Sequence, residues 1–149
     1  GVTNSIDPCY VEEFDKKYLV WGSFHDLYIS ELTDDGLAIK NFSKKTKIAG
    51  GAFEGAMIYK RGSYYYLFAS VGSCCEGVNS TYRTVVGRST SITGPYTNKQ
   101  GGSMVSNNYT TILKGNDQDT TAKSLPTMPD RTGCSTTPTV PPRPIRDVC

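Results

Sequence analysis

The chain has 149 residues, of which 20% are charged, and its formal net charge is only +2. Such a small net charge argues against nucleic acid or a strongly acidic molecule as a partner, and the length predicts one domain. The single histidine, His25, excludes a metal site built from several histidines. No apolar run reaches the roughly 18 residues of a membrane-spanning helix, so no membrane association is expected.

Short alternating segments separated by turn residues fill the first third of the chain. Turns are expected at Asp15-Lys16 and at Asp34-Asp35-Gly36. We predict four antiparallel strands around them, at residues 9–14, 17–23, 27–32 and 37–42.

The same layout returns further along the chain, with no convincing amphipathic helix between the two parts. A turn is expected at Arg61-Gly62-Ser63, and a long insertion at Val71–Tyr82. The predicted strands of this second unit lie at residues 56–60, 64–70, 83–88 and 110–113.

The two units form an internal repeat that aligns without a gap at an offset of 47 residues. Asp7 lies 16 residues before Ser23, and Glu54 lies 16 residues before Ser70. Repeats of about 40–50 residues made of short strands are typical of β-propeller blades. The sequence therefore predicts an all-β fold in which two acids on neighbouring blades point towards one axis.

Each of these acids also has a simpler interpretation. An aspartate before Pro8 can serve only to form a turn, and Glu54 can be a surface charge. Because both acids occupy the same position in the repeat, with similar flanking motifs, we favour a functional role for the pair.

Six motifs in one order resemble glycoside hydrolase family 43, most closely its arabinan endo-1,5-α-L-arabinosidase-like members. They are Asn4-Ser5-Ile6-Asp7-Pro8, Val20–Phe24, Phe53-Glu54-Gly55, Tyr64–Ser70, Val71–Gly77 and Val86–Tyr96. The resemblance implies a five-bladed β-propeller. About two blades would be present, at residues 4–45 and 50–117, within a partial domain of residues 1–117.

The resemblance also implies the inverting scheme of glycoside hydrolysis, with one carboxylic acid as proton donor and one carboxylate as base. Glu54 corresponds to the general acid, and Asp7 to the acid that tunes the pKa of the donor and orients it. Ala56 follows Glu-Gly where the family has proline or another small residue. The general base would lie upstream of Asn4. The acids at the turns, Asp15, Asp26, Asp34 and Asp35, are interpreted as solvated loop residues.

Four further residues are candidates for substrate binding. Phe24 and His25 follow a blade strand where family members place cleft-lining aromatic residues, although His25 can equally be a plain loop residue. Cys74 and Cys75 resemble a loop near the substrate groove, and we expect them to shape it and not to act as nucleophiles. Two reduced thiols are favoured over a strained disulfide between neighbours, and the five cysteines leave the redox compartment undecided.

The predicted parent protein is a monomer that hydrolyses α-1,5-linked arabinan, or related hemicellulose and pectin side chains, outside the cytoplasm, secreted or periplasmic. A central calcium or similar ion is expected in the intact parent, and no cofactor in this chain. The chain alone is expected to be inactive. The alternatives are a family 43 β-xylosidase or arabinofuranosidase, and a non-catalytic carbohydrate-binding propeller fragment.

The tail, residues 118–149, differs in composition from the rest. Residues 119–149 contain no Phe, Trp or Tyr and six of the eight prolines, so disorder is expected. Back-translated and read one nucleotide earlier, residues 119–139 can encode GHNGEIITDDAGQDWLLYHAY, which resembles the next family segment. We predict a frameshifted tail in which the histidine that would bind the metal is lost. A natural Pro/Thr-rich linker is the alternative.

Overall fold

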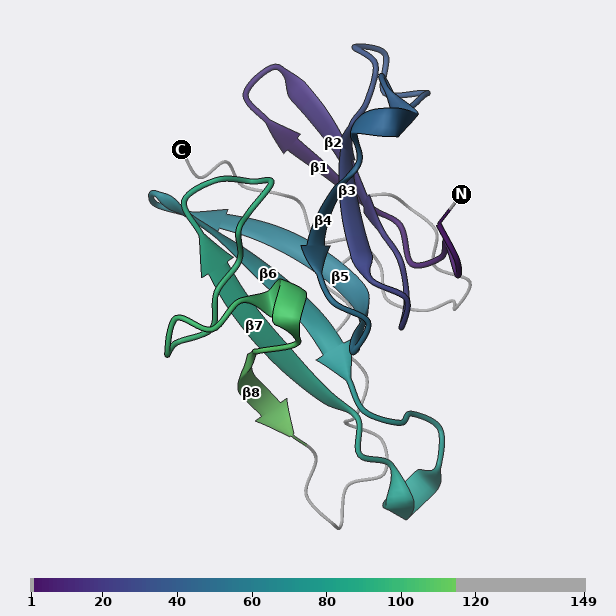
Figure 1. Cartoon of the computed structure of the whole chain (residues 1–149), viewed down its shortest axis with the longest axis vertical. Helices are drawn as coiled ribbons and strands as arrows, with labels where there is room; N and C mark the ends of the chain where they lie inside the picture. The colour runs from purple at the N-terminus through teal and green to yellow at the C-terminus, as the bar shows by residue number, and fades with distance from the viewer. Residues whose placement is uncertain (1, 115–149) are drawn as a thin grey trace, which may run out of the picture.

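The computed structural model describes residues 2–114, which form two four-stranded antiparallel sheets (Figure 1). The first sheet contains β1 (Cys9–Glu13), β2 (Lys16–Trp21), β3 (Leu27–Glu31) and β4 (Thr46–Ala49). The second contains β5 (Phe53–Arg61), β6 (Tyr64–Val71), β7 (Arg83–Ser89) and β8 (Thr110–Lys114). The predictions of an all-β fold and of two repeated four-stranded units are confirmed.

The remaining regular elements of residues 2–114 are short 3₁₀ helices, η1 (Phe42–Lys44), η2 (Gly77–Asn79) and η3 (Met104–Ser106). Within this range no helix is long and apolar enough to cross a bilayer. The predicted tail lies outside the described residues.

The first hairpins of the two sheets differ in register although their sequences align without a gap. Lys17 pairs with Glu12 in the first sheet, whereas its repeat counterpart Tyr64 pairs with Arg61. The pairing is thus shifted by two residues, which is the side-chain period of a strand, so each residue keeps its face. A β-bulge between Glu54 and Met57 then shifts the register again.

The fourth strand of the first sheet is not where the sequence predicted it. The segment 37–42 forms no strand: it makes a single bridge from Ile39 to Leu32, η1 begins at its last residue, and β4 follows at Thr46–Ala49. Leu37 is 86% exposed, whereas Ile48 and Ala49 are fully buried. Burial of the apolar pair, and not the weak alternation before it, decides which segment pairs with β3.

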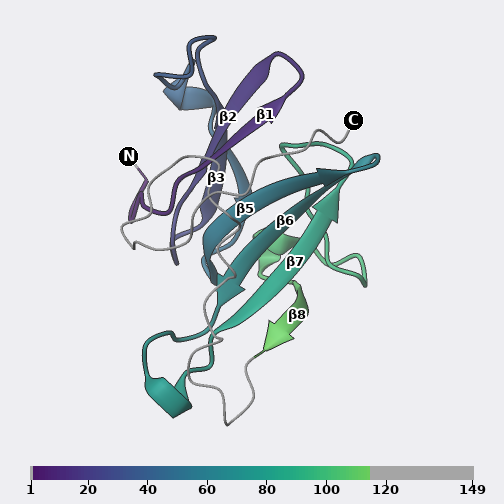
Figure 2. The same ribbon diagram turned by 180° about the vertical axis from the view of Figure 1, so that it is seen from behind.

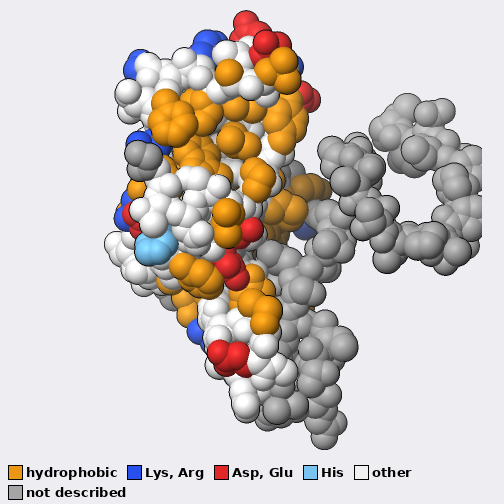
Figure 3. Space-filling view, turned by 90° about the vertical axis from the view of Figure 1, so that its right-hand side faces the viewer, with side chains coloured by type: hydrophobic (Ala, Val, Ile, Leu, Met, Phe, Trp, Pro, Cys, Tyr) orange, Lys and Arg blue, Asp and Glu red, His pale blue; other side chains and the backbone are white. Residues whose placement is uncertain are grey.

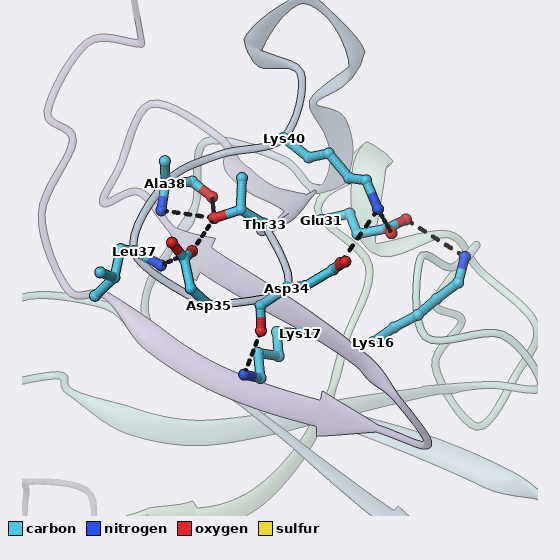
Figure 4. Close-up of polar contacts among 9 residues, drawn as sticks. All are labelled: Lys16, Lys17, Glu31, Thr33, Asp34, Asp35, Leu37, Ala38 and Lys40. Atoms are coloured by element: carbon cyan, nitrogen blue, oxygen red, sulfur yellow. Dashed lines mark hydrogen bonds and ion pairs between the residues drawn. The ribbon is translucent and has the colours of Figure 1, made fainter.

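Local side-chain hydrogen bonds stabilise a turn at the start of this segment (Figure 4), whose backbone meets the end of β3 where the Lys40 N–H donates to the Glu31 carbonyl at 2.9 Å. Asp35 Oδ1 accepts a hydrogen bond from Thr33 Oγ1 and another from the Leu37 N–H at 3.0 Å. The Thr33 hydroxyl, as the main cause, holds the pKa of Asp35 below its usual value. Such aspartate-centred turns compete with strand pairing, which explains the failed prediction.

One hydrophobic core joins the two sheets. The strand β5 of the second sheet lies against β1, β2 and β3 of the first. Figures 1 and 2 show this strand from opposite sides of the molecule. The core members Leu27, Ile48, Phe53 and Leu67 are at most 1% exposed. Because the same core spans both sheets, the ends of the two sheets are held at fixed positions relative to each other.

The connection between β7 and β8 adds a second contact between the sheets. Its η3 helix buries Met104, whose carbonyl accepts a hydrogen bond from the Gly50 N–H at 2.9 Å, just after β4. In the same connection Tyr96 is buried and donates its hydroxyl to the Ile92 carbonyl at 2.7 Å.

Candidate active site

The segment before β1 forms an arm that lies along the end of β2. The Gly22 N–H donates to the Ile6 carbonyl at 2.9 Å, and Asn4 Nδ2 donates to the Ser23 carbonyl at 2.8 Å. Asn4 and Asp7 both have a φ of 55°, a left-handed conformation that Asn and Asp tolerate better than other non-glycine residues. The arm therefore turns at Asp7 and presents its carboxylate to the neighbouring sheet.

Glu54 lies inside β5, opposite Ser70 of β6, at the start of the β-bulge. Gly55 takes a φ of 59° within the bulge, a conformation that glycine adopts without steric cost. A bulge changes the direction of the strand and of the side chains beside it. The half-buried Glu54 carboxylate is thus placed at the junction of the two sheets.

Two hydrogen bonds join the arm and the end of β2 to the Glu54-Gly55 dipeptide. Ser23 Oγ donates to Glu54 Oε2 at 3.1 Å. The Gly55 N–H donates to Asp7 Oδ2 at 3.2 Å. The structure therefore brings together the two segments that the repeat singled out, and Asp7 is connected to Glu54 through the adjacent backbone amide.

Tyr82 is a further member of this site that the sequence did not indicate. Burial is the main cause that raises the pKa of the Tyr82 phenol, and hydrogen bonding to the Glu54 carboxylate contributes in the same direction. The nearby Ser70 hydroxyl lowers that pKa, by less than burial raises it but by more than the hydrogen bonding to Glu54 does. Tyr82 therefore stays a neutral phenol beside the Glu54 carboxylate.

Cys74 and Cys75 lie exposed on the loop between β6 and β7, and both are free thiols. A hydrogen bond to Cys75 is the main cause that raises the pKa of the Cys74 thiol, and the charge of Glu54 adds to it. Cys74 is thus close enough to Glu54 to sense its charge, and its raised pKa fits a residue that shapes the site and not a nucleophile.

Phe24 and His25 lie at the same end of the first sheet. Phe24 is 42% exposed, and its N–H donates to the Phe53 carbonyl at 2.8 Å, next to Glu54 in the chain. Both residues line an open hollow of about 410 Å³, together with Val2, Thr3, Asp26, Tyr28 and Gly51. Figure 3 shows the histidine in pale blue on a face where acidic and hydrophobic side chains also gather. The expected contact of Phe24 and His25 with the substrate stays a prediction.

Several other acids of residues 2–114 have basic partners elsewhere. The ion pairs join Glu13 to Lys60, Asp26 to Lys47, and Glu31 to Lys16 and Lys40. Within the same range no group of three His, Cys, Asp or Glu side chains could hold a metal ion. These residues thus provide no ligand cluster for the metal ion expected in the parent.

The sequence resembles a known family and several of its members. A model described as glycosyl hydrolases family 43 matches residues 1–124. An extracellular endo-α-(1→5)-L-arabinanase of Bacillus subtilis is 41% identical over 124 residues, which are 77% of this chain and 37% of that protein. An extracellular exo-α-(1→5)-L-arabinofuranosidase of Cellvibrio japonicus is 41% identical over 96 residues, which are 64% of this chain and 25% of that protein.

Solved structures show the same similarity. The endo-arabinanase of Bacillus licheniformis superposes with a TM-score of 0.72 at 40% identity, over 78% of this chain and 42% of that chain. The α-L-arabinanase of Cellvibrio cellulosa in complex with arabinohexaose gives 0.71 at 33% identity, over the same shares. The two sheets are therefore about two blades of a five-bladed β-propeller, and the chain spans between a quarter and roughly two fifths of the length of these relatives.

Proposed function

The chain belongs to glycosyl hydrolase family 43, and we propose that it carries the proton donor of an inverting arabinan hydrolase. In this proposal Glu54 is the general acid, and Asp7 is the carboxylate that holds the donor in place. The observation that carries the proposal is the convergence of both segments at one junction, through the bonds Ser23–Glu54 and Gly55–Asp7.

The proposed reaction breaks the bond between the anomeric carbon of one arabinose unit and the oxygen that links it to the next. Glu54, as a carboxylic acid, gives its proton to that leaving oxygen. A base on the opposite face of the sugar takes a proton from water, whose oxygen forms the new bond with inversion of configuration. Asp7 restricts Glu54 by accepting the hydrogen bond of the neighbouring Gly55 amide.

In this proposal the described residues supply the acid side of the reaction, and the base belongs to another part of the parent protein. Glu13, Asp26 and Glu31 are engaged with lysines, as described above. We therefore expect no release of reducing sugar when the 149-residue chain is incubated with linear arabinan. Turnover that Glu54→Gln abolishes would contradict this expectation and would show that a base is present.

A chimera tests the role of Glu54 directly. Residues 1–114 would replace the aligned part of the Bacillus subtilis endo-arabinanase, and hydrolysis of linear arabinan would be measured. In an active chimera, Glu54→Gln is expected to reduce kcat by at least 100-fold, since it removes the proton donor. Asp35→Asn, in an exposed loop, is the matched control and should leave kcat unchanged. Equal activity of the Glu54→Gln and control chimeras would refute the assignment.

Exo-acting hydrolysis of the same polymer is the second candidate, because an exo-acting relative matches this chain at the same identity as the endo-acting one. Chromatography of the early products distinguishes them. Release of arabinose alone supports exo action, and release of oligosaccharides supports endo action. The names of these relatives also support action outside the cell, where the polymer is accessible.

A further inference from the structure

We propose that Ser23 is a positioning residue that determines which oxygen of Glu54 carries the transferable proton. This inference rests on the proposed function of Glu54 and extends it to a residue of the neighbouring blade. Its direct basis is the hydrogen bond from Ser23 Oγ to Glu54 Oε2 at 3.1 Å, which crosses from the end of β2 to β5.

Ser23 is held firmly enough to act in this way. It is 1% exposed, and its carbonyl accepts a hydrogen bond from Asn4 Nδ2 at 2.8 Å. The N–H groups on either side of it, those of Gly22 and Phe24, donate to the carbonyls of Ile6 and Phe53 at 2.9 and 2.8 Å. The main chain of Ser23 is therefore held on both sides, so its side chain starts from a fixed position beside Glu54.

The chemistry of a hydroxyl makes this contact selective between the two carboxyl oxygens. A serine has one proton to donate, and here it is directed at Oε2. In this proposal Ser23 keeps donating to Oε2 when Glu54 is protonated, which places the acidic proton on Oε1, where it can pass to the leaving oxygen. After proton transfer the same hydrogen bond becomes charge-assisted and stabilises the carboxylate that remains.

Other groups also face Glu54 and are unchanged by a substitution at Ser23. They are Asp7 from the arm, Tyr82 before β7 and Cys74 from the preceding loop. Because all variants to be compared retain these three residues, a difference between them reports the effect of the Ser23 hydroxyl.

The test is a carboxyl titration of Glu54 by ¹³C NMR in the complete 149-residue chain, with the signal assigned by its loss in Glu54→Gln. Ser23→Ala should raise the titration midpoint of this signal relative to the unsubstituted chain, because the hydrogen bond that the Ser23 hydroxyl donates to the carboxylate is lost. Ser30→Ala is the control, since Ser30 is also buried in the first sheet and its hydroxyl has no hydrogen-bond partner among residues 2–114. It should leave the midpoint unchanged.

An unchanged midpoint in Ser23→Ala, or an equal shift in Ser30→Ala, would overturn the proposal. If Ser23→Ala does not fold, Ser23→Cys keeps a weaker donor of similar size and should shift the midpoint in the same direction. Failure of the arabinan assignment would have a separate signature: the Glu54→Gln chimera would stay as active as its control, whatever the titration shows.

Discussion

The two copies of the repeat place their acids in different local structures. Asp7 lies outside the sheet, in a left-handed turn before β1, whereas Glu54 lies within β5 at a bulge. The carboxylate of the first copy accepts a backbone hydrogen bond from the second copy, and the carboxylate of the second accepts a hydroxyl hydrogen bond from the first. The copies therefore complement each other at one site, although their sequences align without a gap.

The serines that end the aligned segments 17–23 and 64–70 show the same asymmetry. Ser23 reaches across the junction to Glu54. Its counterpart Ser70 is fully buried, and its hydroxyl has no partner of normal hydrogen-bond geometry within residues 2–114. The repeat thus supplies the same groups twice, and the contact between neighbouring blades decides how each is used.

The largest expected effect comes from exchanging the residues before these serines. Gly22 has a φ of 120°, and a Cβ there would lie 2.2 Å from the Asp26 carbonyl oxygen. Gly22→Ala should therefore lower the free energy of unfolding by about 3 kcal/mol or more, as measured by urea denaturation. Its counterpart Ala69 lies in the regular strand β6, so Ala69→Gly should cost about 1–2 kcal/mol. Equal losses would mean that the two strand ends are structurally equivalent after all.

Removal of the Asp7 carboxylate should have the next largest effect. Asp7→Ala leaves the Gly55 N–H without its acceptor and should reduce the free energy of unfolding by about 1–2 kcal/mol. Asp7→Asn keeps an oxygen acceptor and the tolerance for positive φ, so its loss should be smaller. Urea titrations of the two variants make the comparison. An equally large loss in Asp7→Asn would show that the charge, and not the acceptor, stabilises the junction.

A smaller effect, dependent on pH, is expected at the ion pair between Glu13 of β1 and Lys60 of β5. Partial burial acts to raise the pKa of Glu13, but hydrogen bonds from Lys60 and Tyr65 keep that pKa below its usual value. The pair therefore stabilises the fold above the unfolded pKa of about 4.3 and stops doing so as pH falls through the lower folded pKa.

Glu13→Gln should consequently lower Tm by about 2–4 °C at pH 7 and by almost nothing near pH 3. Thermal unfolding followed by circular dichroism at both pH values measures this difference. A Tm difference that persists unchanged in acid would show that the contact acts through packing and not through charge.

The smallest effect is expected at Ser30. Its buried hydroxyl has no hydrogen-bond partner in the described part of the chain, so Ser30→Ala removes an unsatisfied polar group there and should change Tm by no more than about 2 °C, in either direction. A clear fall in Tm would reveal a partner for this hydroxyl and would disqualify the variant as a control for Ser23→Ala.

The sequence predicts the strands that carry strong apolar patterns and fails where local side chains compete with pairing. The segment 64–70 has a dense aromatic and apolar pattern and becomes β6, whereas the expected strand at 37–42 gives way to the turn around Asp35. Repeat spacing locates Asp7 and Glu54, because that spacing is a property of the chain. The role of Ser23 depends on a contact between blades and that of Tyr82 on a contact within the second blade. No local pattern records either contact, although Ser23 ends the predicted strand 17–23.

The central claim is that both copies of the repeat build one carbohydrate site. The most direct measurement is an NMR titration of the ¹⁵N-labelled chain with arabinohexaose. Shifts are expected at the amides of Ser23, His25 and Gly55, on both sides of the junction, and Glu54→Ala should weaken them. Saturable shifts confined to one sheet, or no shifts at millimolar sugar, would contradict the claim.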